Sequence, residues 1–426
     1  MKKYILIILC CLTSFPLWSY NVNMIVEHYS VDQGLPNNTV NCTLKDRDGF
    51  IWFGTWYGLC CFDGVKFKTF NKQEHDSHVP PRKIQRIVED KNGYIWVKTI
   101  DRKLYVFNKV TECFHAVYDD MKNYSENIQV IKLQNTAEGD VLLLTKDKNL
   151  LLAGVDEKGQ VTIKILFDSR DEINKHDYTL KHHVLCETEE YISWIGTDYK
   201  VSAVHKGAEL ASRPADFITS KINSGDKDSF TSFFEDGRKV WVGDRAGIFY
   251  SIDVRTGLVN RYVLSEIKGA ISNLLVTPAG YVYLSVAGQG TYEYDLAERR
   301  LQKINTEMND AMVTHAFIDQ YDKIWFHENE KALIYYDPLN HTAKRFPFTM
   351  FGKITTLYSE DAGERGLFFL SPAGEAWLFD REHVEMVYIN KLKQLSNDRA
   401  NQQFYHLMLD NDGVLWLSSA DEGVYC

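Results

Sequence analysis

The chain of 426 residues exceeds one ordinary compact domain unless it is built from repeats. Its hydrophobic content of 45% and aromatic content of 13% allow a large core and exclude a disordered chain. The formal net charge of -10 argues against DNA or RNA as a partner, because affinity for a polyanion comes from clustered Lys and Arg side chains.

The first residues have the pattern of an export signal. Lys2 and Lys3 precede an apolar run that continues to about Trp18, and Ser19 is a small residue at a suitable cleavage point. The run is short for a membrane span. We therefore expect a signal peptide over residues 1–19 and a periplasmic mature chain.

A short pattern then recurs along the chain: a turn, a Gly–aromatic–Ile–Trp strand, a second turn and a strand that ends on aromatic–Asp. Successive copies are 42 to 52 residues apart. A period in the forties with four strand-like segments is typical of a β-propeller blade. Nine copies align on one position, which holds Trp52, Trp96, Leu142, Trp194, Trp241, Tyr283, Trp325, Phe368 and Trp416.

The first copy predicts the four strands of a blade. They span Val40–Leu44, Phe50–Gly54, Leu59–Phe62 and Val65–Phe70, and Asp63-Gly64 forms the last hairpin turn. A blade cannot bury both of its faces alone, so adjacent blades stack. We therefore assign the recurrent tryptophans to the core between blades: Trp52, Trp96, Trp194, Trp241, Trp325 and Trp416.

The ends of the chain bear on how the ring closes. Residues 24–36 resemble the fourth strand of a blade, and the chain ends at Cys426 just after a third strand, so the first strand can complete the last blade. All nine copies could form one large ring. Because propellers usually have about 4–8 blades, we favour an all-β, seven-bladed propeller over residues 20–340, followed by the first blades of a second propeller over residues 341–426.

Residues 34–64, GLPNNTVNCTLKDRDGFIWFGTWYGLCCFDG, closely resemble the two-component regulator propeller repeat. The shared pattern is GL, then D-x-x-G-x-I/L-W, then G-T, then an aromatic residue before Asp-Gly. The resemblance implies the periplasmic sensor of a hybrid two-component system of the Bacteroidetes type. Such sensors detect oligosaccharides from polysaccharide breakdown and control the genes that use them. It also implies that the kinase, the membrane helix and the contacts of a homodimer lie downstream of these residues.

In a propeller, the turns between the second and third strands share a face with the entry to each blade, which is the usual ligand side. The candidate contacts on these turns are Trp56, Tyr57, Arg102, Tyr199, Asp244 and Arg245. Aromatic rings stack on the apolar faces of sugars, and Asp and Arg pair with hydroxyls or uronates.

Two other classes of function stay open. A propeller glycoside hydrolase or polysaccharide lyase would need paired carboxylates or a Tyr or His base, and a scaffold would bind protein through the same face.

The sequence identifies no catalytic residue, cofactor or metal site. Asp46-Arg47-Asp48-Gly49 starts like a calcium loop, but no distal Glu follows it. The cysteine spacings make no disulfide framework, and adjacent Cys60 and Cys61 should face opposite sides of a strand.

Overall fold

The computed structural model describes residues 25–426, apart from residues 71, 74–80, 122–128, 147–148, 168–179, 189, 197–199, 208–216, 222–229, 305–312, 329–330, 352–357, 362–365, 372–373, 392–403 and 411. The expected signal peptide therefore lies outside the described residues. Within them, no helix combines the length and the apolar character that a membrane crossing requires.

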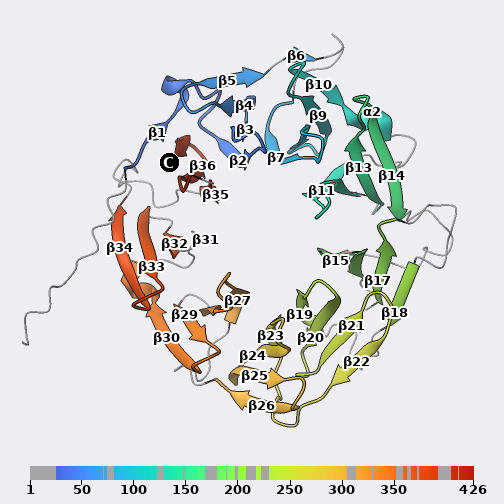
Figure 1. The fold of residues 1–426 in the computed structure, drawn as a ribbon, viewed down its shortest axis with the longest axis vertical. Helices are drawn as coiled ribbons and strands as arrows, with labels where there is room; N and C mark the ends of the chain where they lie inside the picture. The colour runs from blue at the N-terminus through green and yellow to red at the C-terminus, as the bar shows by residue number, and fades with distance from the viewer. Residues whose placement is uncertain are drawn as a thin grey trace, which may run out of the picture.

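The described strands form nine sheets around one ring. As Figure 1 shows, the first strand of each sheet lies nearest the ring axis and the last lies at the rim. We number the sheets 1 to 9 from the sheet that begins at β2. The all-β propeller predicted from the repeat is confirmed.

The bounds of the elements follow in chain order. Sheets 1 to 3 comprise β2 (Val40–Lys45), β3 (Ile51–Thr55), β4 (Gly58–Phe62), β5 (Phe67–Phe70); β7 (Ile84–Glu89), β8 (Ile95–Thr99), β9 (Leu104–Asn108), β10 (Cys113–Ala116), with β6 (Lys72–Gln73) at the edge; β11 (Val130–Asn135), β12 (Val141–Thr145), β13 (Leu150–Val155), β14 (Val161–Phe167). Sheets 4 to 6 comprise β15 (Leu180–Glu187), β16 (Tyr191–Gly196), β17 (Lys200–His205), β18 (Phe217–Lys221); β19 (Phe230–Glu235), β20 (Lys239–Asp244), β21 (Phe249–Asp253), β22 (Val259–Tyr262); β23 (Ile271–Val276), β24 (Tyr281–Val286), β25 (Gly290–Asp295), β26 (Arg300–Lys303). Sheets 7 to 9 comprise β27 (Val313–Ile318), β28 (Ile324–Glu328), β29 (Ala332–Asp337), β30 (Thr342–Pro347); β31 (Tyr358–Asp361), β32 (Leu367–Leu370), β33 (Glu375–Asp380), β34 (Glu385–Lys391); β35 (Phe404–Leu409), β36 (Leu415–Ser419), β37 (Val424–Tyr425), with β1 (His28–Tyr29). Short helical turns are η1 (Val31–Gln33), α2 (Val117–Asp120) and η5 (Phe348–Phe351).

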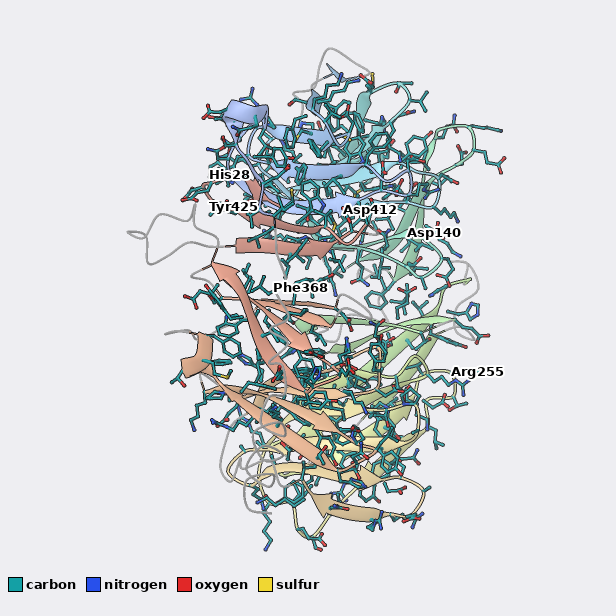
Figure 2. All side chains as sticks on the ribbon, turned by 60° about the vertical axis from the view of Figure 1, so that its left-hand side comes forward. His28, Asp140, Arg255, Phe368, Asp412 and Tyr425 are labelled. Atoms are coloured by element: carbon teal, nitrogen blue, oxygen red, sulfur yellow. The ribbon has the colours of Figure 1, made fainter. Side chains whose placement is uncertain are left out.

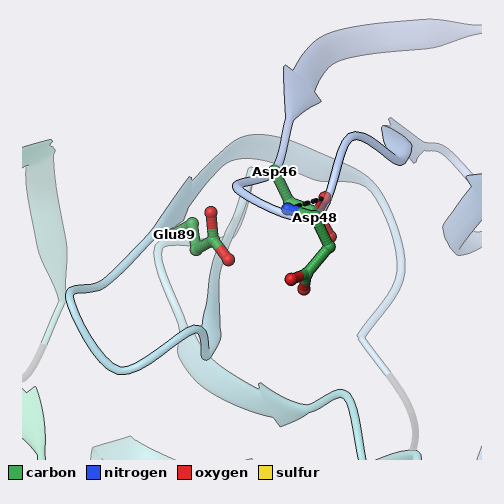
Figure 3. Close-up of side chains that lie close together, drawn as sticks. All are labelled: Asp46, Asp48 and Glu89. Atoms are coloured by element: carbon green, nitrogen blue, oxygen red, sulfur yellow. Dashed lines mark hydrogen bonds between the residues drawn. The ribbon is translucent and has the colours of Figure 1, made fainter.

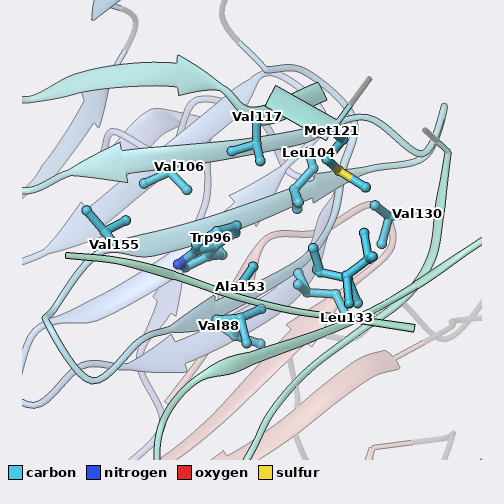
Figure 4. Packing of buried hydrophobic residues seen from close by; sticks show 13 residues of the cluster. Val88, Trp96, Leu104, Val106, Val117, Met121, Val130, Leu133, Ala153 and Val155 are labelled. Carbon is cyan, nitrogen blue, oxygen red and sulfur yellow. The ribbon is translucent and has the colours of Figure 1, made fainter. Parts of the chain in front are cut away.

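Packing between consecutive sheets provides the core. Nine clusters of buried hydrophobic side chains each join two sheets that follow one another around the ring, and one of them joins sheet 9 to sheet 1. Figure 4 shows the cluster between sheets 2 and 3, with Trp96 near its centre. Cys60 packs in the cluster on one side of sheet 1 and Cys61 in the cluster on the other, as their adjacency predicted.

The recurrent tryptophans lie where the repeat placed them, on the second strand of six of the sheets. Their side chains are buried between sheets in the five cases that the structure describes: Trp52, Trp96, Trp241, Trp325 and Trp416. The side chain of Trp194 lies outside the described residues. The assignment to the inter-blade core is confirmed for these five.

The ring closes between the two ends of the chain. Strand β1 pairs antiparallel with β37, so that His28 lies opposite Tyr425. Figure 2 shows these two residues side by side, and their rings stack with centroids 4.6 Å apart. The N-terminal strand thus completes the last sheet, as its resemblance to a fourth strand predicted.

The favoured division at residue 340 differs from this arrangement. Strands β29 and β30 lie on either side of that boundary and pair within one sheet. Sheets 8 and 9 continue the same ring, because buried clusters join sheet 7 to sheet 8 and sheet 8 to sheet 9. In the described residues the chain therefore follows the alternative account, one ring of nine sheets. The physical reason is that the strand completing the last sheet comes from the N-terminus.

Candidate functional site

The turn between the first two strands of a sheet carries a repeated hydrogen-bond brace. Asp46 Oδ1 accepts from the backbone N–H groups of Asp48 and Phe50, and its Oδ2 accepts from Trp52 Nε1 at 2.8 Å. Each such carboxylate closes its turn and satisfies the one polar atom of a buried indole. The same brace occurs between Asp90 and Trp96, Asp236 and Trp241, Asp319 and Trp325, and Asp410 and Trp416.

Asp46, Asp48 and Glu89 bring their carboxylates together on this side of the ring, which we call the turn face (Figure 3). Three carboxylates so close could bind a divalent cation. Here Lys109 Nζ lies 3.1 Å from Asp46, 2.7 Å from Asp48 and 2.8 Å from Glu89. Burial opposes the ammonium charge, but the hydrogen bonds to the three carboxylates still raise the pKa of Lys109. The cluster is therefore a salt-bridge network between sheets 1 and 2.

Two other interfaces carry the same network. Lys206 pairs with Glu138 and Glu187 across sheets 3 and 4. Arg381 pairs with Asp319 and Asp361 across sheets 7 and 8. In each case the basic residue follows the third strand of one sheet, and it reaches the turn of the preceding sheet. Recurrence in register at three interfaces indicates a structural role for the acidic cluster.

The opposite side of the ring, the loop face, carries the turns between second and third strands. Trp56 and Tyr57 are exposed there, at 40% and 63% of their surfaces. Lys83 Nζ lies 5.2 Å from the centroid of the Trp56 ring. Backbone hydrogen bonds from Lys83 to Trp56 and from Ile100 to Lys83, each 2.9 Å, link this turn to the next. With Arg102, two residues beyond Ile100, these residues form the aromatic–basic patch: Trp56, Tyr57, Lys83, Ile100 and Arg102.

Sequence reasoning missed two cations close to this patch. Arg86 on β7 lies directly opposite Lys98 on β8 in the strand register. Lys98 is 7% exposed and donates from Nζ to the backbone carbonyl of Ile131 at 2.8 Å. We call Arg86, Lys98 and Arg102 the basic triplet. Comparison of the copies could have drawn attention to Lys98, because three other copies have glycine at this strand position: Gly54, Gly196 and Gly243.

Of the remaining predicted contacts, the structure describes Asp244 and Arg245, and both lie on sheet 5, away from the patch. Asp244 is buried at the end of β20, where its Oδ1 accepts from the N–H groups of Ala246 and Ile248. Burial raises the pKa of Asp244, and these bonds only partly oppose that effect. It closes its own turn and is not presented to a ligand. Arg245 is exposed on sheet 5, and Tyr199 lies outside the described residues.

A cavity of about 360 Å³ lies between sheets 2 and 3. Its lining includes Tyr94, Cys113, His115, Asp120 and Gln160. His115 Nε2 lies 2.6 Å from Asp120 Oδ2, and Cys113 precedes His115 by two residues on β10. A histidine oriented by a carboxylate can act as a general base, so this cavity is where an enzymatic function would be sought.

The titration of Lys98 gives a testable pH dependence. Burial, together with the charges of Arg102 and Arg86, lowers the pKa of Lys98 from 10.5 to about 8. Between these two values the unfolded chain binds the proton and the folded chain does not, so the folded state gains stability as pH rises through that window. We expect the free energy of unfolding of the unmodified protein to rise, relative to Lys98→Met, above about pH 8. Urea denaturation of both proteins across this range measures it, and parallel pH curves would contradict the assignment.

Comparison with known proteins adds one match in sequence. Residues 34–57 match the family described as Two component regulator propeller. The matched segment begins just before β2 and ends on Trp56 and Tyr57 of the aromatic–basic patch. Among curated proteins, none matches this sequence.

Solved structures with similar chain traces include extracellular domains of two hybrid two component systems of B. thetaiotaomicron. The first is 14% identical with a TM-score of 0.39, and the match covers 93% of this chain and 66% of that chain. The second is 15% identical with a TM-score of 0.35, and the match covers 93% of this chain and 58% of that chain. The chain thus spans less than two thirds of the length of both. Virginiamycin B lyase from Staphylococcus aureus is 9% identical with a TM-score of 0.35, over 71% of this chain and 96% of that one.

Proposed function

We propose that this chain is the exported, periplasmic sensor region of a hybrid two-component histidine kinase and that it binds an oligosaccharide released by polysaccharide breakdown. One observation carries the proposal. The segment that matches the two component regulator propeller family ends on the exposed pair Trp56 and Tyr57, which lies on the loop face of the ring. The kinase and the membrane helix would belong to other parts of the protein.

The patch has the chemistry that a saccharide needs. Aromatic rings offer flat apolar surfaces to the C–H faces of a sugar ring. Lys83 lies over the Trp56 ring, and both Lys83 and Arg102 on the following turn can donate hydrogen bonds to hydroxyl or carboxylate oxygens. The backbone bonds that join the Trp56 turn to residues 83 and 100 hold the two neighbouring sheets in fixed register, so the platform is organised before a ligand arrives.

Signalling then requires that the ligand distinguish two arrangements of the sensor. A saccharide that binds one packing of two protomers more tightly shifts the population toward it, and a ligand with equal affinity for both shifts nothing. We propose that a homodimer passes this shift through its membrane helices to the kinase.

The substitution Trp56→Ala tests the proposed site. We expect it to lower the affinity for the cognate oligosaccharide about tenfold or more, because loss of one stacked aromatic removes on the order of 1–3 kcal/mol. Isothermal titration calorimetry against oligosaccharides released from plant and host polysaccharides measures the effect. Phe50→Ala is the matched control, since Phe50 is an exposed aromatic on the turn face. Unchanged affinity in Trp56→Ala would move the site elsewhere, and no saccharide binding at all would refute the proposal.

The competing function is an enzyme that uses the cavity between sheets 2 and 3. His115 and Asp120 favour it, as a base and its orienting partner. Product analysis of the same oligosaccharide mixtures separates the two. Turnover that is lost in His115→Ala would establish the enzyme, and binding without turnover supports the sensor. Binding to a protein alone would support the scaffold.

A further inference from the structure

Sheet 2 differs from sheet 1 at two positions, and both differences introduce a cation near the loop face. The position two residues after the strand tryptophan is Gly54 in sheet 1 and Lys98 in sheet 2. A side chain at Gly54 would meet Cys42 Sγ at 2.5 Å and Ile84 Cγ2 at 2.6 Å, which shows how closely sheets pack there. In sheet 2 the same strand position instead holds a long side chain whose ammonium group reaches the Ile131 carbonyl on sheet 3.

The second departure is in the turn that follows. Gly58 in sheet 1 and Gly247 in sheet 5 have positive φ at the turn position that Arg102 occupies in sheet 2. Arg102 adopts φ of 66°, in the left-handed region that non-glycine residues rarely enter. Strain of this kind, about 1–2 kcal/mol, is kept only where the surrounding structure or a function demands it.

The basic triplet also lacks carboxylate partners within the described residues. Lys98 and Arg86 are cross-strand partners, and like charges opposite one another destabilise a sheet. No ion pair of Arg86, Lys98 or Arg102 occurs among the residues that the structure describes. Elsewhere in the ring, Lys109, Lys206 and Arg381 each pair with two or three carboxylates. Lys98, which is buried, has no carboxylate partner among the described residues, although the net charge of the chain is -10.

We propose that Arg86, Lys98 and Arg102 form an anion-binding subsite beside Trp56 and Tyr57, so that the oligosaccharide recognised by this sensor carries a carboxylate or sulfate group. This inference rests on the proposed function, because it names the chemical class of the ligand for the same face. The aromatic pair takes the sugar ring, and the triplet takes its acidic substituent.

Anion binding would give the basic triplet the acidic partner that it lacks among the described residues. A carboxylate or sulfate oxygen would accept from Lys98, whose ammonium has three donors and a single described hydrogen bond to the Ile131 carbonyl. The guanidinium of Arg102 can bind the anion through two parallel N–H groups. A negative charge between Arg86 and Lys98 would also offset their mutual repulsion, because it attracts both cations.

The experiment compares saccharides of matched length by titration calorimetry: neutral galacto-oligosaccharides, their O-sulfated derivatives and oligogalacturonates. We expect an acidic probe to bind about tenfold or more tightly than the neutral one, and the preference between sulfated and uronate probes identifies the anion. Lys98→Met should remove this preference, while Lys303→Met, an exposed lysine on β26 at the rim, should keep it. Equal affinity for neutral and acidic probes, or a preference retained in Lys98→Met, would overturn the inference.

A separate readout keeps the two proposals distinguishable. If neutral saccharides bind through Trp56 with no acidic preference, the sensor proposal stands and the anion subsite fails. If no saccharide binds, the sensor proposal fails, and the subsite is judged by inorganic sulfate alone. In that case sulfate should raise the melting temperature of the unmodified protein more than that of Lys98→Met, and equal shifts would refute the subsite.

Discussion

Asp46→Ala should destabilise the protein by roughly 3–5 kcal/mol, because it removes a buried carboxylate from the centre of a hydrogen-bonded network. The side chain accepts from two backbone N–H groups and from Trp52 Nε1, and it also contacts Lys109 Nζ at 3.1 Å. Alanine would leave the buried indole N–H without its partner and would open the turn. Urea denaturation followed by tryptophan fluorescence measures the change.

Asp48→Ala is the matched control for this experiment. Asp48 lies in the same turn and pairs with the same lysine, but its side chain is largely exposed. We expect it to cost less than about 1 kcal/mol, as exposed ion pairs usually do. Equal effects of the two substitutions would mean that the ion pair matters and the indole brace does not. The brace recurs in four other sheets, so that result would remove its role throughout the ring.

Gly423→Ala should destabilise the protein by about 2–5 kcal/mol, by opening the ring where its ends meet. Gly423 has φ of 91°, and a Cβ there would overlap the backbone carbonyl oxygen of Tyr29 on β1. The expected cost combines left-handed strain of about 1–2 kcal/mol with an overpacking cost of about 1–3 kcal/mol. Hydrogen exchange should show faster exchange at the amides of β1 and β37 as well as the lower global stability.

Gly64→Ala separates the clash from the strain. Gly64 has φ of 93°, and nothing lies within 4 Å of the position that its Cβ would take. We expect this control to cost only the strain, about 1–2 kcal/mol. Equal losses in the two variants, with unchanged exchange in β1, would show that closure by the N-terminal strand contributes nothing.

The strands and their turns could be read from the sequence because they depend on residues close together in the chain. Strand bounds in sheet 1 agree with the prediction to within one residue, apart from the start of the fourth strand, which lies two residues later. Asp63 shows the reason: its Oδ1 accepts from the N–H groups of Val65 and Lys66, so the hairpin turn is closed within four residues. The burial of Trp52 follows equally from its recurrence in every strong copy.

The candidate site was only partly predictable. Trp56, Tyr57 and Arg102 were named from the sequence, because turn positions follow directly from the repeat. Asp244 was also chosen because it precedes a turn between second and third strands, but its carboxylate closes that turn. The adjacent residues in the sequence did not show which way this carboxylate points. Lys98 and Arg86 went unnamed because both lie in strands, where a ligand contact is not expected.

The sequence alone determined that this protein is a ring of stacked four-stranded sheets, since its period, its Asp-Gly turns and its strand tryptophans act within one repeat or between neighbours. It also supplied the exposed aromatic pair. The tertiary structure decided the number of sheets in the ring, because every interface uses the same kind of face and the series ends where β1 pairs with β37. It decided as well that Arg86 and Lys98 lie opposite one another, since strand register depends on pairing and not on composition.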